Sequence, residues 1–273
     1  MAPRQLRGLG IAKPQEWRYR DEMNSQVAIL KEALDLLGGL LEEWRARGIG
    51  EGKRDIQRSY INRHAWNIHG LGNGLLVLAA AGRLGSVYLL SRPALESLFK
   101  LAAAVADDRF AAQKVVAEVE EESEKIRHWL GAAPPEWAST LEKMIEVLGQ
   151  FGSDLRKRYG VSERRRWKTY EVAKLGKLEA EYVRDYFLGS THVHAMLSAL
   201  TAREGELYVP EALYRVTVVV IHASGLVNKA LMDLENCGAP GVFERAIEIH
   251  RRAKAEYDSV AKVQAAALKA AGF

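Results

Sequence analysis

The sequence predicts an all-α protein, an antiparallel helical bundle, and three observations lead to this prediction. Apolar residues recur at three- and four-residue spacing in almost every long segment of the chain, which is the period of an amphipathic helix. Proline is rare, and Ala, Leu, Glu, Lys and Arg, which favour helices, dominate the composition. No segment shows the convincing alternation of apolar and polar residues that marks a half-buried strand. Short connections favour antiparallel neighbours.

Residues 24–47 and 55–81 are expected to form the first two helices of the bundle. The face of the first helix that should be buried carries five apolar residues: Leu30, Leu34, Leu37, Leu41 and Trp44. A glycine-rich segment at residues 48–52 follows a basic last turn, as is typical of a helix end. A Gly-Arg-Leu-Gly turn at residues 82–85 ends the second helix.

The middle of the chain is expected to form three further helices. Ser86 should cap a helix that reaches Ala106, because a serine side chain accepts a hydrogen bond from a free backbone N–H at a helix start. A helix with many charged residues follows over residues 108–130. An Ala-Ala-Pro-Pro break then leads to a helix over residues 135–159.

The last third of the chain should contain three helices as well. A basic hinge leads to a helix near residues 175–200, and a turn at 204–210 precedes a helix over 211–236. The β-branched run at residues 216–221 has strand propensity, but it lies inside a longer helical pattern and therefore predicts a buried helix. A Gly-Ala-Pro-Gly break separates it from a C-terminal amphipathic helix over residues 242–271.

The whole chain, residues 1–273, is expected to form one domain, because no internal repeat is evident and the connections are short. The segment 107–160 carries the most charge and is expected to form a helical excursion from the main bundle. The formal net charge of +4 is mild, so it permits an acidic partner without demanding one.

Several observations predict a cytoplasmic protein without a membrane segment. The single cysteine, Cys237, cannot form an internal disulfide, which fits a reducing compartment. Residues 1–13 lack the apolar core of a secretory signal. The longest apolar runs, at residues 75–81 and 216–221, are far shorter than the roughly 20 residues that span a bilayer.

Polar side chains occupy the expected core in three stretches, and burying them is costly unless they are paired or form a site. The first stretch lies on the second helix. Its members fall within an arc of about 80°, and they are Arg58, Asn62, Trp66, His69 and Asn73. Two interpretations stay open, a stripe at the solvent boundary or a groove that holds a polar ligand.

Arg63 and His69 lie in the same stretch, and their spacing resembles the Arg-x4-6-His signature of the HEPN ribonucleases. The resemblance implies a metal-independent ribonuclease in which Arg63 holds phosphate and His69 helps proton transfer. The chemistry suits these residue types, because guanidinium matches phosphate and imidazole titrates near neutral pH. Six residues turn a regular helix by about 600°, so the two side chains would meet only at a distorted turn or across a dimer.

Arg92 and Glu96 form the second polar stretch, since side chains four residues apart can pair on one helix face. Pro93 removes a backbone donor and should kink the helix beside them. In the third stretch, Tyr186 begins a ridge of hydrogen-bonding groups that repeats every four residues. If that ridge faces the Arg92–Glu96 pair, the result is either a structural tie between helices or a functional site.

The ridge of the third stretch continues with Ser190 and His194. A His-x-His sequence occurs here, but two residues in a helix point about 200° apart, so it does not predict zinc. No metal site is expected elsewhere either. No cofactor is expected, because the sequence has no glycine-rich phosphate loop and no Cys-x2-Cys or His-Glu-x2-His motif.

Two patterns together resemble the DUF5677 family of prokaryotic helical proteins. They are Leu-Leu-x-Arg-Pro-x-Leu-Glu-Ser at residues 89–97 and Tyr-x3-Ser-x3-His at residues 186–194, within a resemblance that covers roughly residues 34–231. The resemblance implies a helical organisation similar to HEPN-type domains, which occur in toxin–antitoxin and anti-phage systems. It places four residues at recurring polar positions of the family: Arg92, Glu96, Ser190 and His194. His194 departs from the HEPN pattern, since no arginine lies four to six residues before it.

A basic segment with aromatic residues forms the last candidate site. The expected nucleic-acid-binding residues are Arg164, Arg165, Arg166, Trp167 and Lys168. Such residues can bind RNA phosphates and stack bases. The alternative is a solvated hinge between helices, because acidic residues flank the run.

Two hypotheses for the function follow from these observations. The first is a non-catalytic helical interaction or ligand-binding module of a prokaryotic cytosolic system, with anti-phage defence as its setting. The alternative is a HEPN-like, metal-independent ribonuclease or toxin that acts on RNA. In either case the expected partner is a second copy of the chain or another protein, with RNA as a further partner in the alternative.

Overall fold

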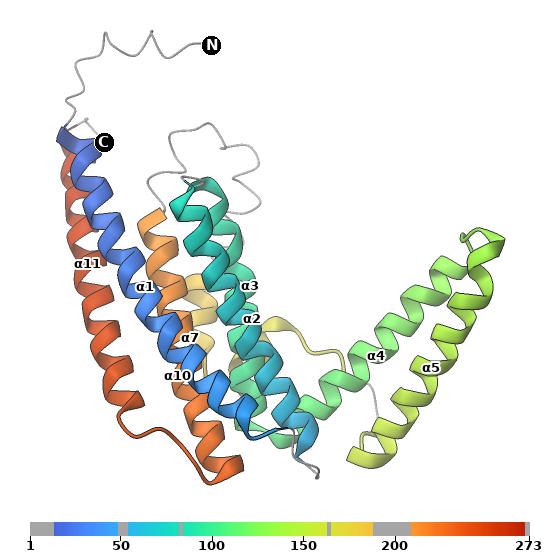
Figure 1. Ribbon diagram of the computed structural model, residues 1–273. Coiled ribbons are helices and arrows are strands. Elements are labelled where there is room, and N and C mark those ends of the chain that lie inside the picture. The colour runs from blue at the N-terminus through green and yellow to red at the C-terminus, as the bar shows by residue number, and fades with distance from the viewer. Residues whose placement is uncertain (1–13, 49–53, 82–83, 163–164, 188–208, 271–273) are drawn as a thin grey trace.

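A computed structural model describes residues 14–48, 54–81, 84–162, 165–187 and 209–270 of the chain. In these ranges every regular element is a helix and no strand occurs, so the all-α prediction is confirmed. The elements are α1 (Pro14–Ala46), α2 (Asp55–Ala80), α3 (Leu84–Ala106), α4 (Asp108–Leu130), α5 (Pro135–Tyr159), α6 (Thr169–Leu175), α7 (Glu179–Glu181), the π-helix η2 (Tyr182–Phe187), α10 (Val209–Glu235) and α11 (Val242–Ala270). Figure 1 shows α1, α2, α3, α10 and α11 side by side in a bundle, with α4 and α5 standing away from it.

Most predicted helix boundaries are confirmed, and three predicted starts are wrong. Helices α4 and α5 begin and end at the predicted residues. Helix α1 begins at Pro14, ten residues before the predicted start at Asn24, because proline is well tolerated in the first turn of a helix. Helix α3 is already helical at Leu84, so Ser86 lies inside the helix and cannot be its cap.

The predicted helix near residues 175–200 is wrong at its start, because α6 ends where that helix was expected to begin. Gly176 follows α6 and approaches α3 so closely that an added Cβ would lie 2.7 Å from the Cβ of Ala102. Lys177 then adopts a left-handed backbone conformation with φ of 59°. This turn against α3 separates α6 from α7. The rest of the predicted helix, from residue 188 on, lies outside the described residues.

Helix α10 lies in the middle of the bundle and contacts α1, α2, α3 and α11. Val216, Val219 and Val220 are buried, which confirms the prediction of a buried helix here. Among the described helices, the Glu211–Glu235 stretch of α10 is the one long and apolar enough to cross a membrane by length and composition. Most of that stretch is buried inside the bundle, as expected for a core helix that packs on several sides.

Helix α1 packs between α10, α11 and α2 through the apolar face that the sequence predicted. The closest approach to α2 is at Gly72, where an added Cβ would lie 2.6 Å from Cδ2 of Leu34. Arg252 of α11 donates to Glu32 of α1 at 2.5 Å. This ion pair joins the first and last helices of the bundle.

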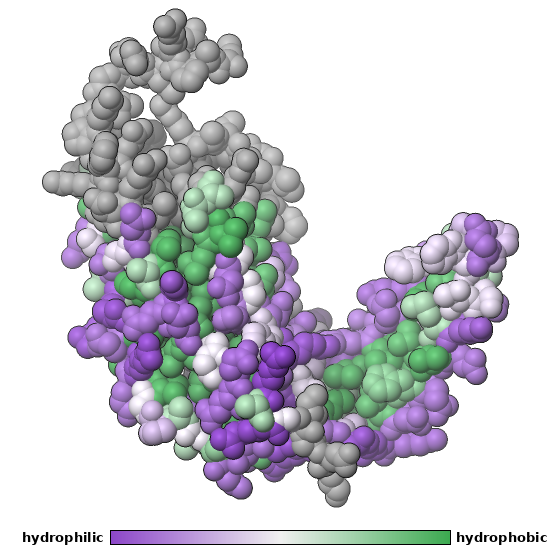
Figure 2. Space-filling view, in the orientation of Figure 1, coloured by the Kyte–Doolittle hydropathy of each residue, from purple (hydrophilic) through white to green (hydrophobic). Residues whose placement is uncertain are grey.

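Helices α4 and α5 form a hairpin that contacts the bundle at the base of α2 and α3 (Figure 1). Asp55, the first residue of α2, accepts hydrogen bonds from Arg158, at 2.6 Å, and from the Tyr159 hydroxyl. Arg63 of α2 binds Glu118 of α4 at 2.8 Å. These contacts hold the end of α5 and the middle of α4 against α2. Figure 2 shows apolar side chains along the visible face of the hairpin.

His64 is a buried imidazole at the junction of α2, α3 and α4, with 6% of its surface exposed. Its ring makes an edge contact with Tyr60 at 4.5 Å, and neither ring nitrogen has a hydrogen-bond partner among the described residues. Burial, with smaller contributions from the positive charges of Lys100, Arg63 and Lys114, lowers the pKa of His64 to about 3. The imidazole is therefore neutral in the folded protein near pH 7.

His64 should make the folded state sensitive to acid. Below pH 6.5 the unfolded chain binds a proton on this imidazole, while the folded chain does so only near pH 3. Above pH 6.5 His64 therefore does not reduce the free energy of unfolding. Between pH 6.5 and pH 3 its protonation in the unfolded chain lowers that free energy by about 1.4 kcal/mol per pH unit. Between pH 7 and pH 5, wild type should lose about 2 kcal/mol more unfolding free energy than His64→Phe, measured by urea denaturation.

The matched control is His128→Gln, because His128 is exposed on α4. This variant should lose as much stability as wild type over the same pH interval. Equal losses in wild type and His64→Phe would contradict the assignment of the acid sensitivity to His64.

Candidate functional site

The π-helix η2 and helix α3 bring three polar side chains together. The Tyr186 hydroxyl donates to Glu96 at 2.9 Å, and the Arg92 guanidinium donates to the Tyr186 oxygen at 3.0 Å. Arg92 also donates through Nε to Glu96 at 3.2 Å. The sequence-based pairing of Arg92 with Glu96 is therefore present, and Tyr186 closes the Arg92–Glu96–Tyr186 cluster.

Aromatic contacts position the tyrosine of this cluster. Tyr186 stacks on Tyr182 with ring centres 5.1 Å apart and meets Phe99 of α3 edge-on at 6.0 Å. The Arg92 guanidinium lies 5.0 Å from the centre of the Tyr186 ring, which adds a cation–π contact. Tyr182 and Tyr186 both lie on η2, and π-helical turns are often found at functional sites.

The cluster is half-exposed, with 32% of the Arg92 side chain and 38% of the Glu96 side chain accessible to solvent. It therefore ties η2 to α3 and also presents a guanidinium and a carboxylate to solvent. Hydrogen bonding to Tyr186 and then to Glu96 raises the pKa of Arg92 despite its partial burial. Ser190 and His194, which sequence reasoning placed on the same ridge, lie outside the described residues.

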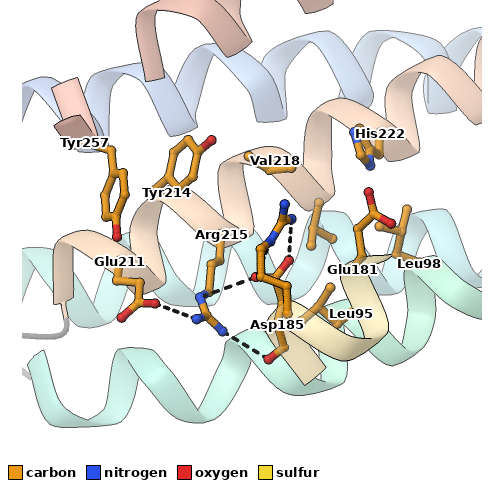
Figure 3. Close-up of a pocket in the computed structure, with 12 residues that line it drawn as sticks. Leu95, Leu98, Glu181, Asp185, Glu211, Tyr214, Arg215, Val218, His222 and Tyr257 are labelled. Carbon is orange, nitrogen blue, oxygen red and sulfur yellow. Dashed lines mark hydrogen bonds and ion pairs between the residues drawn. The ribbon is translucent and has the colours of Figure 1, made fainter. Parts of the chain in front are cut away.

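A cavity of about 290 Å³ opens beside η2, between α3, α7, α10 and α11 (Figure 3). Leu95 and Leu98 of α3 form one apolar wall, and Val218 and Val219 of α10 form another. The charged and imidazole side chains that line the cavity are Glu181, Arg184, Asp185, Glu211, Arg215 and His222. This hollow is less open to solvent than those on the α4–α5 hairpin.

Asp185 is the centre of an ion-pair network at one end of the cavity, and 9% of its surface is exposed. Arg184 binds both of its carboxylate oxygens, at 2.9 and 2.6 Å. Arg215 of α10 donates to the backbone carbonyl of Asp185 at 3.0 Å and to Glu211 at 2.5 Å. Figure 3 draws these contacts as dashed lines. They engage both guanidinium groups of the cavity.

Glu181 and His222 lie at the other end of the cavity, where Figure 3 shows the carboxylate pointing toward the imidazole. No hydrogen bond or ion pair joins either side chain to another described residue, but the Glu181 charge acts on both His222 and Arg184. Burial lowers the pKa of His222, with opposing contributions from nearby charges, so the ring is neutral near pH 7. Tyr214 and Tyr257 line the cavity as well and stack on each other with ring centres 4.6 Å apart.

Sequence reasoning missed the cavity residues of α10. The available signal was a polar strip on an otherwise apolar helix, since Glu211, Arg215 and His222 recur at four- and seven-residue spacing. That spacing places them on one face. The partner residue Asp185 could not be found this way, because it follows Arg184 in a segment whose helical form was predicted incorrectly.

The structure does not bring Arg63 and His69 together within one chain. Arg63 binds Glu118 of α4, whereas His69 packs toward α1, where an added Cβ on Gly38 would lie 3.1 Å from its Nε2. The His69 ring also meets Trp66 edge-on at 5.6 Å. The reason is the regular geometry of α2, which directs the two side chains to different neighbours. The expected catalytic pair is therefore not formed here.

The polar stripe on α2 contains both an ion pair between helices and solvent-facing groups. Arg58 binds Glu235 at the end of α10 at 2.6 Å, so the start of the stripe joins two helices of the bundle. Asn73 is exposed and donates to the backbone carbonyl of His69 at 3.0 Å. These contacts agree with a stripe at the solvent boundary, which was one of the two sequence-based interpretations.

The basic segment is organised around a tryptophan that packs inward. Trp167 meets the buried ring of Phe110 edge-on at 5.2 Å, and Arg165 lies 3.6 Å from the centre of the indole ring. Trp167 is only partly buried, so its role in nucleic-acid binding stays a prediction. Arg166 and Lys168 are exposed, and Arg164 lies outside the described residues.

Comparisons with known proteins place more than half of the chain in one family. Residues 58–206 match the model of DUF5677, a family of unknown function. The match contains the Arg92–Glu96–Tyr186 cluster and η2, but it ends before α10. No curated protein and no solved structure matches the chain. Among the described residues, no group of three or more His, Cys, Asp or Glu side chains could hold a metal ion.

Removing the Tyr186 hydroxyl should destabilise the folded chain. Tyr186→Phe keeps the ring contacts but leaves Arg92 and Glu96 each without one hydrogen-bond partner. We expect a loss of about 1 kcal/mol in the free energy of unfolding. Tyr170→Phe on α6 is the matched control, since that exposed hydroxyl makes no hydrogen bond to the described residues. Equal stability of the two variants in urea denaturation would show that the cluster contributes nothing to folding.

Proposed function

The chain belongs to the DUF5677 family of unknown function, and we propose that it is a non-catalytic helical binding module. In this proposal a small polar ligand occupies the cavity between α3, η2, α10 and α11. We also propose that the protein acts in the cytosol of a prokaryote, in anti-phage defence. The ground for this setting is the resemblance to the family alone.

The observation that carries the proposal is a cavity that combines apolar walls with fixed charges. Its volume of about 290 Å³ is near the lower end of the roughly 300–1,000 Å³ typical of ligand pockets, which indicates a small ligand. Arg184, Asp185 and Arg215 hold one another in place. Groups that are already fixed lose little conformational entropy when a ligand binds.

Binding at the cavity is favoured over catalysis because its Arg215 and Asp185 groups are occupied by ion pairs and hydrogen bonds. The Arg63 and His69 pair, which a ribonuclease would need, is separated. Ligand binding requires only shape and complementary charge, and both are present in the cavity.

A fragment screen with a filled-cavity variant tests this function. Val218→Phe places a larger side chain into the cavity, so polar fragments that bind wild type in ligand-observed NMR should no longer bind this variant. Val263→Phe adds the same bulk at an exposed position of α11 and should keep binding. The proposal fails if no fragment binds wild type, or if binding survives in folded Val218→Phe.

A metal-independent ribonuclease is the second candidate, and the Arg92–Glu96–Tyr186 cluster favours it. A half-exposed guanidinium can hold phosphate, and a carboxylate bonded to a phenol can move a proton. The distances within the cluster, 2.9 to 3.2 Å, are those of working hydrogen bonds. His194 is the sequence-based candidate for the remaining acid–base group.

RNA cleavage in the presence of EDTA tests the ribonuclease directly. If this candidate holds, wild type cleaves tRNA or total RNA, while folded Arg92→Ala and His194→Ala lose at least a hundredfold of the rate, a typical contribution of one acid–base or phosphate-binding group. Arg109→Ala, an exposed arginine of α4, should cleave like wild type. No cleavage by wild type, or equal cleavage by all four proteins, excludes the candidate.

A further inference from the structure

The charges that line the cavity do not balance. Three carboxylates, of Glu181, Asp185 and Glu211, face two guanidinium groups, of Arg184 and Arg215. Both guanidinium groups are already bound to carboxylates, at 2.5 to 2.9 Å. Glu181 is the carboxylate without an ion pair among the described residues, so the described lining of the cavity has one negative charge in excess at this point.

The surroundings of Glu181 accept hydrogen bonds. The neutral imidazole of His222 lies across from the carboxylate in Figure 3 and has one ring nitrogen available as an acceptor. No ion pair joins Glu181 to a lysine or arginine of the described residues, although its charge is close enough to raise the pKa of Arg184. A ligand group that donates several hydrogen bonds and carries positive charge would satisfy both acceptors, and an ammonium group has these properties.

The rest of the cavity suits the apolar part of such a ligand. Leu98 and Val219 are almost fully buried at its walls. Tyr214 and Tyr257 contribute stacked rings to the same cavity, and aromatic faces attract cations as well as apolar groups. The cavity therefore places an anionic end and an apolar, aromatic body within one small volume.

We propose that the cavity binds a small organic cation, a protonated primary amine with an apolar or aromatic body, and that Glu181 is its counter-ion. This inference rests on the proposed function and names the ligand class of the same site. An anionic ligand is disfavoured, because Arg184 and Arg215 would have to leave Asp185 and Glu211 to bind it, which would leave the buried Asp185 carboxylate without its ion pair.

Three probes of similar size and different charge test the ligand class: benzylamine, benzyl alcohol and benzoate. Each is titrated into the full chain at pH 7 and followed by ligand-observed NMR. Benzylamine should bind at least tenfold more tightly than the alcohol, because the loss of a charge-assisted hydrogen bond costs roughly a factor of ten or more. Benzoate should bind more weakly than either.

Two variants locate the binding. Glu181→Gln removes the charge while keeping the shape of the side chain, and it should weaken benzylamine at least tenfold while leaving benzyl alcohol unchanged. Glu179→Gln is the matched control, because Glu179 lies on the same short helix but does not line the cavity. It should bind benzylamine like wild type.

The outcomes separate the ligand class from the function. If benzyl alcohol or benzoate binds as tightly as benzylamine, and Val218→Phe abolishes that binding, the binding module stands and the cationic ligand class is wrong. Equal weakening of benzylamine by Glu181→Gln and Glu179→Gln also overturns the role of Glu181. If no probe and no screened fragment binds, both the ligand class and the proposed function fail.

Discussion

The burial of α10 is the constraint on which the rest of the structure depends, because this helix contacts α1, α2, α3 and α11 at once. A helix surrounded in this way must be apolar over most of its surface, and Val216, Val219 and Val220 meet that requirement. Charged side chains on such a helix are tolerated only where another element supplies partners. Asp185 of η2 is the partner of Arg215 on α10. The cavity lies beside this contact, so its position follows from how α10 packs in the bundle.

The π-helix η2 connects the cavity to the Arg92–Glu96–Tyr186 cluster. Two consecutive residues contact different helices, since Asp185 binds Arg215 of α10 while Tyr186 binds Arg92 of α3. A segment of six residues therefore joins two helices that are far apart in the sequence. A change of position in η2 would alter both places, because the two contacts share one short piece of backbone.

The α4–α5 hairpin is attached to the bundle but supplies no residue to the cavity. Its attachment depends on polar contacts with α2, such as those of Asp55 with Arg158 and of Arg63 with Glu118. The proposed binding cavity therefore lies in the bundle alone. Arg63 forms an ion pair between α2 and α4. Partly exposed ion pairs of this kind contribute little to stability individually, so the apolar contacts between α4 and the bundle must hold most of the junction.

The sequence by itself determined the helical class, the boundaries of α4 and α5 and the buried face of α1, because these follow from local periodicity, proline breaks and glycine ends. It also identified the pairing of Arg92 with Glu96, which lie four residues apart on one helix. Only the tertiary structure decided that Tyr186 joins this pair, that Arg63 and His69 do not meet, and that Asp185 binds Arg215. Those contacts bridge residues 30 to 94 positions apart, and their geometry depends on a close approach of Gly176 to α3 and on a π-helix, neither of which local patterns encode.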